Sequence, residues 1–285
     1  MAAILVVAVL ALGAVVLLSN PRHRAFYFGR AGDNGEPGAD KKPRASAPAV
    51  ERAAEAAPPG RVRVPLPDAQ GRVVVPIADR MPWRLPAEGA PPGWVLHEFA
   101  GNAAAELTRT DGLLVLRLRA DHASFAVYRD VVLDLTQFPY LSWSWKVMRL
   151  PVQGDVRDAA RNDQAAQVYV IFPRWPHAPT GSDVLGYVWD SQAPAGTQTA
   201  FANAPNVRVI VVQSGTARTE TWVREQRNVA RDYVALFGRP PPRVGAVALM
   251  IDTDHTRGDA ETYFGDLVFS RAPLVGVENA TSMLR

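Results

Sequence analysis

Beyond residue 73, the chain is dominated by apolar and polar side chains that alternate with a period of two. Eight segments show this pattern and are rich in Val, Ile and aromatic residues, which suit the pleated, half-buried surface of a sheet. The segments are Leu113–Ala120, Ala123–Asp130, Leu141–Val147, Ala166–Phe172, Asp183–Asp190, Val207–Gln213, Val244–Ile251 and Thr262–Phe269. Turn-forming residues separate several of them, so the pattern predicts a domain built of short strands.

One stretch, from Thr221 to Gly238, has a helical period instead. Its shared face is predicted to consist of Trp222, Gln226, Val229, Ala230, Tyr233 and Phe237. Gly238 suits the left-handed conformation that closes many helices. Many short strands with a single amphipathic helix are typical of an antiparallel β-sandwich of the jelly-roll type, and this is the fold we expect.

The chain begins with a different pattern. Residues 2–18 are all apolar or glycine, a run at the short limit for crossing a membrane as a helix. Because no basic region precedes the run and no small-x-small cleavage site ends it, residues 1–20 are expected to be a transmembrane anchor or an uncleaved signal. Residues 21–72 are rich in Ala, Pro, Gly and charge and predict a flexible tether. The expected sandwich spans 73–272, followed by a tail over 273–285.

Composition removes several classes of function. The chain has 31 basic and 28 acidic side chains, a net charge of +3 that is modest for its length. Because binding duplex phosphates needs a clustered basic face more than a slightly basic balance, no nucleic-acid partner is expected. The absence of cysteine excludes disulfides, thiolate catalysis and zinc sites built on sulfur. The histidines are scattered singly and there is no Gly-x-Ser-x-Gly motif, which disfavours the usual hydrolase and zinc-enzyme arrangements.

The segment Ile251-Asp252-Thr253-Asp254 resembles the nucleophile motif of aspartate phosphatases. Their later segments supply a lysine, and no lysine follows Asp252 in this chain. Two interpretations then stay open. The aspartates are turn formers whose side chains satisfy loop backbone groups, or Asp252 and Asp254, with Asp266 or Asp259, supply oxygen ligands for calcium. Calcium is the only cofactor that the sequence suggests.

Alternation along the strands also predicts a ligand surface. Trp143 and Trp145 share a face with Leu141 and Val147, which assigns them to the core. Polar and amphipathic residues in the other alternation class could form a groove in which aromatic rings contact sugar faces and cations donate hydrogen bonds. The predicted set is Lys146, Gln167, Tyr169, Tyr187, Trp189 and Arg208. An ordinary solvated sheet face is the alternative.

Several sequence blocks, in order, resemble the bacterial domain of unknown function 3047 family from about Trp94 to Phe269. They include YLSWSWKV, NDQAAQVYVIF, LGYVWDSQAPAGT and VALMIDTDHTRGDAETYFGDLVF. The final strand, loop and strand are similar to those of galactose-binding-like jelly rolls in carbohydrate-binding modules. The resemblance implies an exported or membrane-anchored protein on the periplasmic side, and it implies no activity.

Together these observations predict a membrane-tethered, extracytoplasmic module that binds a carbohydrate or a related polar envelope ligand without catalysis. One alternative is a β-sandwich enzyme acting on polysaccharide. It would use a carboxylate pair such as Asp163 and Asp190 for hydrolysis, or a Tyr169 base beside Arg208, Arg227 or Asn228 for elimination. The other alternative is a structural envelope domain that binds protein partners.

Overall fold

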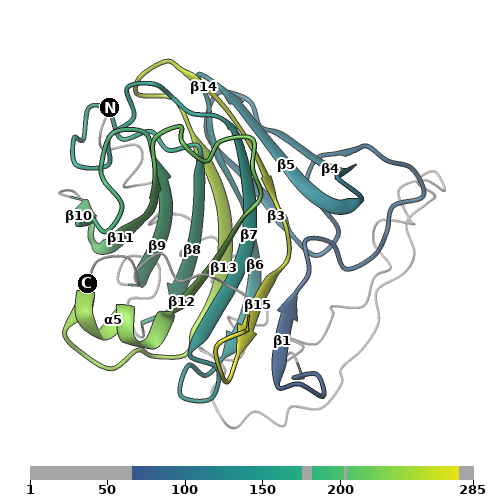
Figure 1. The fold of residues 1–285 in the computed structure, drawn as a ribbon, viewed down its shortest axis with the longest axis vertical. Coiled ribbons are helices and arrows are strands. Elements are labelled where there is room, and N and C mark those ends of the chain that lie inside the picture. The colour runs from purple at the N-terminus through teal and green to yellow at the C-terminus, as the bar shows by residue number, and fades with distance from the viewer. Residues whose placement is uncertain (1–65, 175–181, 202–203, 276–285) are drawn as a thin grey trace, which may run out of the picture.

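The computed structural model describes residues 66–174, 182–201 and 204–275, which form a sandwich of two sheets (Figure 1). The predicted membrane segment over residues 1–20 and most of the predicted tether lie outside the described residues. Among the described residues, no helix has the length and apolar character needed to cross a membrane. The first strand begins at Arg72 and the last ends at Ser270.

Eight strands form the first sheet, which we call sheet A. In sheet order these are β1 (Arg72–Val75), β15 (Leu267–Ser270), β7 (Tyr140–Arg149), β14 (Asp259–Phe264), β5 (Leu113–Asp121), β4 (Ala104–Thr110) and β2 (Ala87–Glu88), with β12 (Val223–Asn228) on β7 as well. All pairings in this sheet are antiparallel. β14 and β15 follow one another along one edge of β7, and β12 occupies the other edge.

Seven strands form sheet B. Their order is β10 (Gln198–Phe201), β11 (Ala204–Ser214), β9 (Asp183–Asp190), β8 (Ala166–Phe172), β13 (Val244–Asp252), β6 (Ser124–Leu133) and β3 (Val95–Ala100). They are antiparallel except for β9 and β11, which pair in parallel. The predicted antiparallel β-sandwich is therefore confirmed except for this one parallel pair, which the sequence did not indicate.

The last predicted strand, Thr262–Phe269, is two strands. The chain breaks between β14 and β15 at Gly265 and Asp266, where the backbone passes close to β7. A Cβ on Gly265 would lie 2.6 Å from Oγ of Ser144, and Oδ1 of Asp266 accepts a 2.9 Å hydrogen bond from the backbone N–H of Ile77. These contacts turn the chain without moving it off the edge of β7.

The predicted helix is wrong in its first half. Val223–Asn228 is strand β12, because the open edge of β7 supplies backbone hydrogen-bonding partners for this segment. Helix α5 (Val229–Phe237) begins only at the Asn228 cap, whose side chain accepts a 3.0 Å bond from the backbone N–H of Arg231. Gly238 closes it in the left-handed conformation, as predicted, with φ 69°. In Figure 1, α5 lies below β11 and β9.

The main core lies between the two sheets and is rich in aromatic rings. Trp143 and Trp145 of β7 are buried there, as predicted. The Trp143 ring stacks on Tyr187 with centroids 5.2 Å apart, and Trp145 meets Trp189 at 5.9 Å. Aromatic pairs of this kind add to the free energy gained from burial.

A second apolar cluster covers the opposite face of sheet B. It takes Tyr169, Val188, Val209, Ala248 and Met250 from successive strands, and Val156 and Ala193 from loops pack with it. Strands β8, β9 and β13 are consequently buried at every position. Sheet B is thus an internal sheet with apolar contacts on both faces, whereas sheet A has a polar outer face.

Candidate functional site

The six residues predicted to line one ligand groove do not come together. Lys146 lies on the outer face of sheet A, where its Nζ is 3.0 Å from Oδ2 of Asp111. Gln167 and Tyr169 lie on the outward face of sheet B beneath the second cluster, and the Tyr169 hydroxyl donates to Oε1 of Gln167 at 2.5 Å. Both are almost fully buried. These three side chains therefore belong to two different surfaces.

Tyr187 and Trp189 point the other way, into the main core, where neither is exposed. Each satisfies its polar atom locally: the Tyr187 hydroxyl donates to Asp232 at 2.9 Å and the Trp189 indole N–H donates to the carbonyl of Gly215 at 2.9 Å. Arg208 instead contacts the end of α5, where its guanidinium donates a hydrogen bond to the carbonyl of Leu236. The predicted shared groove is corrected accordingly.

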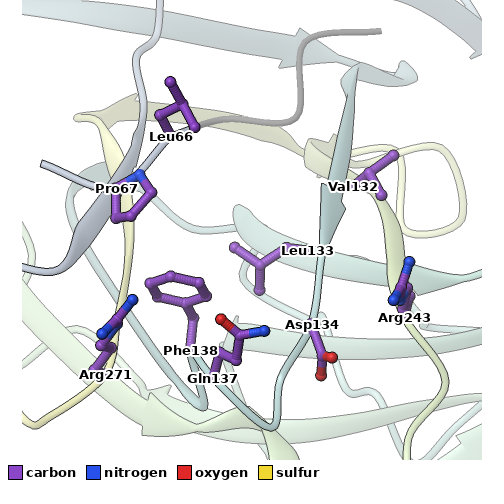
Figure 2. A pocket seen from close by; sticks show the side chains of 9 residues that line it. All are labelled: Leu66, Pro67, Val132, Leu133, Asp134, Gln137, Phe138, Arg243 and Arg271. Carbon is purple, nitrogen blue, oxygen red and sulfur yellow. The ribbon is translucent and has the colours of Figure 1, made fainter.

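The structure instead shows a pocket at one end of the sandwich, where four chain segments meet (Figure 2). Its cavity is about 360 Å³. The walls come from the start of the described chain, the end of β6 with the turn after it, the residue before β13 and the residue after β15. The lining residues are Leu66, Pro67, Val132, Leu133, Asp134, Gln137, Phe138, Arg243 and Arg271.

Antiparallel pairing explains why these segments meet. Val244, the first residue of β13, pairs with Leu133 of β6, and Ser270, the last of β15, pairs with Tyr140 of β7. Arg243 directly precedes Val244, and Arg271 directly follows Ser270. The two side chains therefore reach the pocket from strands of both sheets and lie on opposite sides of it, as Figure 2 shows.

The charges at this opening are mostly positive. Oδ1 of Asp134 accepts bonds of 2.8 and 2.7 Å from the backbone N–H and the hydroxyl of Thr136. Those bonds, with a smaller contribution from Arg243, hold the pKa of Asp134 below its usual value. The Arg271 guanidinium lies 5.3 Å from the centre of the Phe138 ring, a cation–π arrangement. Within the described part of the chain, neither Arg243 nor Arg271 forms an ion pair.

A second group of polar side chains lies where β13 ends. Asp252 closes that strand, Asp254 and His255 follow in the loop to β14, and Asp163 comes from the long loop before β8. Each of the four offers one potential ligand atom, and these atoms all lie within 4.8 Å of one another. Asp252 and Asp254 therefore come together as predicted, but Asp266 does not join them, since its carboxylate holds Ile77 elsewhere.

Burial and like charge dominate the electrostatics of this group, which we call the Asp163 cluster. Burial, reinforced by the carboxylates of Asp254 and Asp163, raises the pKa of Asp252 well above its ordinary value. The carboxylates of Asp163 and Asp254 raise the pKa of His255 to about 10. Burial opposes ionisation of Asp254, but its hydrogen bond with His255 and further bonds outweigh that effect and lower the pKa of Asp254.

Asp163 and Asp190, the carboxylates considered for hydrolysis, both accept hydrogen bonds from loop backbone N–H groups. Asp163 accepts bonds from the backbone N–H groups of His255 and Thr256 at 3.1 and 2.6 Å. Asp190 accepts backbone bonds from Val156, Gln192 and Ala193 at 2.8, 2.8 and 2.6 Å. Tyr169, nominated as an elimination base, has a pKa raised by burial. A high pKa and burial both disfavour a role as a general base at neutral pH.

The model of the family described as "Protein of unknown function (DUF3047)" matches residues 92–268. The chain belongs to this family. The match covers both sheets from β3 to β15, and so includes the Asp163 cluster and most of the pocket. No curated protein matches the sequence.

Solved structures similar to this DUF3047 chain come from two kinds of protein. One is the family 11 carbohydrate-binding module from Clostridium thermocellum in complex with a β-1,3-1,4-mixed-linked tetrasaccharide, with a TM-score of 0.39 and 7% identity over 72% of this chain and 98% of that one. Another is the endoglucanase cel12A from Rhodothermus marinus, with a TM-score of 0.39 and 13% identity over 65% of this chain and 99% of that one. The xyloglucanase domain of NopAA from Sinorhizobium fredii, in complex with cellobiose, has a TM-score of 0.37 and 11% identity over 65% of this chain and 96% of that one.

The pocket residues have only a weak signal in the sequence. Arg243 and Arg271 stand directly outside two predicted strands, but such flanking positions are usually solvated turn residues. For the Asp163 cluster, the adjacent Asp254 and His255 were visible, whereas the contribution of Asp163 depends on how two distant loops meet.

Proposed function

We propose that this DUF3047 protein is a non-catalytic, membrane-tethered extracytoplasmic module that binds an acidic carbohydrate in the pocket between Arg243 and Arg271. The observation that supports this is a pair of guanidiniums beside an apolar wall, neither forming an ion pair within the described chain. Arginine binds carboxylates through two parallel hydrogen bonds, so an unpaired guanidinium at a pocket favours an anionic ligand.

The rest of the pocket suits a sugar ring. Leu133 and Pro67 provide apolar surface for the C–H face of a pyranose. Gln137 is exposed and offers an amide for hydroxyl groups. The cavity of about 360 Å³ falls within the usual range for small-molecule sites, roughly 300 to 1,000 Å³. Uronic acids combine the apolar face, the hydroxyls and the carboxylate that these walls require.

The lining supports binding more than hydrolysis. Glycoside hydrolysis generally needs two carboxyl groups on either side of the scissile bond. Asp134 is the single carboxylate among the lining residues, and one of its oxygens already accepts two hydrogen bonds from Thr136. A module that recognises an acidic saccharide without cleaving it fits this arrangement.

Calorimetric titration of the purified full chain tests the proposal, with oligogalacturonate as the acidic probe and a neutral cello-oligosaccharide of equal length beside it. We expect the acidic probe alone to bind, more weakly as salt is added. A hydrogen bond to a charged group contributes about 1.5 to 3 kcal/mol. Arg243→Gln and Arg271→Gln should therefore each weaken binding by roughly tenfold or more.

Arg109→Gln is the matched control, because Arg109 is exposed on β4 and is not one of the residues that line the pocket. It should bind like the wild-type chain. Equal binding of the neutral and acidic probes, or binding that both pocket variants leave unchanged, would refute the proposed site. Release of new reducing or unsaturated sugar ends during the titration would refute the non-catalytic function and favour the enzyme alternative.

A further inference from the structure

The Asp163 cluster contains a buried carboxylate oxygen that the protein does not satisfy. Asp252 is fully buried. Its Oδ1 receives only a long 3.4 Å contact from the backbone N–H of Asp254, and its Oδ2 has no hydrogen-bond donor among the described residues. Removing a carboxylate from water without a partner is costly, so such a group either keeps its proton or pairs with a cation.

The imidazole of His255 does not supply that compensation. Its Nδ1 lies 2.7 Å from Oδ1 of Asp254 and 3.5 Å from Oδ1 of Asp163, so it faces those two carboxylates. Three carboxyl groups therefore surround this one imidazole. The unpartnered oxygen of Asp252 lies among them.

The surrounding loops hold these groups in place without a ligand. The hydroxyl of Thr256 donates to Asp163, and the backbone N–H of Asp252 donates to the carbonyl of Gln164 at 3.1 Å. Thr253 is tied to Ala123 by bonds of 3.1 Å from the Ala123 N–H to its hydroxyl and 2.9 Å from its own N–H to the Ala123 carbonyl. Pre-positioned donor atoms lose little conformational freedom when an ion binds.

We propose that Asp163, Asp252, Asp254 and His255 bind one divalent first-row transition-metal ion, such as Zn²⁺ or Mn²⁺. The four candidate atoms lie within 4.8 Å of one another, whereas ligands of a tetrahedral zinc ion are about 3.4 Å apart. The most distant pair would therefore approach by about 1.4 Å when the ion binds. The free oxygen of Asp252 becomes a ligand instead of an unsatisfied group.

The imidazole decides the class of metal. Calcium takes six to eight oxygen ligands, whereas a mixture of imidazole and carboxylates suits zinc, iron or manganese. The sequence-based expectation of calcium rested on aspartates alone, before His255 and Asp163 could be placed beside them. Asp163 and Asp252 are fully buried, whereas Asp254 and His255 are half-buried. The ion would therefore have a structural role, joining the β13–β14 loop to the loop before β8.

The experiment uses the purified full chain after treatment with a chelator and dialysis. Calorimetry with Zn²⁺, Mn²⁺ and Ca²⁺ should show one equivalent of Zn²⁺ or Mn²⁺ binding at least tenfold more tightly than Ca²⁺, with a rise in the thermal unfolding temperature. Asp252→Asn, which removes the charge at nearly constant shape, should weaken that binding at least tenfold and remain folded without metal. Co²⁺ should give visible absorption bands that change in His255→Gln.

Asp259→Asn is the matched control, because Asp259 is exposed beside the same loop and forms an ion pair with Arg149. It should bind metal like the wild-type chain. No binding of Zn²⁺ or Mn²⁺, binding that Asp252→Asn leaves unchanged, or equal affinity for Ca²⁺ would overturn the proposal. The pocket and the cluster lie at opposite ends of β13, about 27 Å apart at about 3.4 Å per residue, so each proposal can fail without the other.

Discussion

The buried carboxyl group of Glu225 should make the stability of the fold fall as the pH rises. Glu225 is 2% exposed, and its Oε1 accepts a 2.7 Å hydrogen bond from Nε2 of Gln213. Burial raises the pKa of Glu225 from 4.5 to about 7. Because the folded state holds this proton more tightly than the unfolded state, the stabilising contribution is complete below pH 4.5 and is lost as the pH rises through about 7.

The magnitude follows from that pKa change. One pKa unit corresponds to about 1.4 kcal/mol. Moving the pKa of Glu225 from 4.5 to about 7 therefore costs the folded state about 3 kcal/mol at alkaline pH relative to acid. Domains have roughly 5 to 15 kcal/mol of stability in total, so this single group accounts for a measurable share.

Glu225→Gln isolates the effect, since the amide keeps the shape and the acceptor oxygen but cannot ionise. The free energy of unfolding of both proteins can be measured with urea at each pH. Between pH 5 and pH 8, the free energy of unfolding of the variant should rise by about 2 to 3 kcal/mol relative to that of the wild-type chain. Glu88→Gln, at an exposed position of β2, should change nothing. If the difference between the two free energies of unfolding is the same at pH 5 and pH 8, the pKa of Glu225 is not raised in the folded state.

Three further outcomes are expected. Trp189→Ala should lower the free energy of unfolding by about 3 to 5 kcal/mol in urea titrations, because the ring packs against Trp145 in the core; a loss below about 1 kcal/mol would place the ring at the surface. Asn228→Ala should cost about 1 kcal/mol through the lost helix cap, and Asn228→Asp should retain most of it. A compartment-specific reporter fused after Arg285 should be active only outside the cytoplasm, and activity inside would reverse the expected topology.

Strands whose sequence alternates cleanly could be located from the sequence. β8 and β9 match their predicted ranges from end to end, because β-branched and aromatic residues favour a sheet whichever partner they meet. The assignment of Trp143 and Trp145 to the core also follows from local pattern, since their own face carries only apolar neighbours. Short edge strands such as β2, with two residues, carry too little pattern to be seen.

The segment Val223–Asn228 shows where local pattern fails. Its spacing suits a helix, yet it forms a strand because β7 presents an unpaired edge that only the folded sandwich creates. A segment with a weak preference takes the conformation that satisfies the larger number of backbone groups. For that reason the helix begins at the Asn228 cap, later than predicted. It ends at Gly238 as predicted, because that end depends on the conformational freedom of a single residue.

The prediction that six residues share one ligand surface failed for a different reason. Alternation shows which residues of a strand share a face, but not which face is inside. In β8 and β9 both faces are buried, so Tyr169 and Tyr187 look equally amphipathic in the sequence although they lie on opposite sides of one sheet. Arg243 and Arg271 come together only through the pairing of four strands, which no spacing in the sequence reveals.

The central position of β13 bears on how the protein is made. β13 is hydrogen-bonded between β6 and β8, although both are synthesised well before it. At about 5 to 20 residues per second, roughly ten seconds separate the emergence of β8 from that of β13. Throughout that interval two long apolar strands have open edges that other chains can pair with. Substitutions that delay the docking of β13 should therefore appear first as aggregation of the nascent protein.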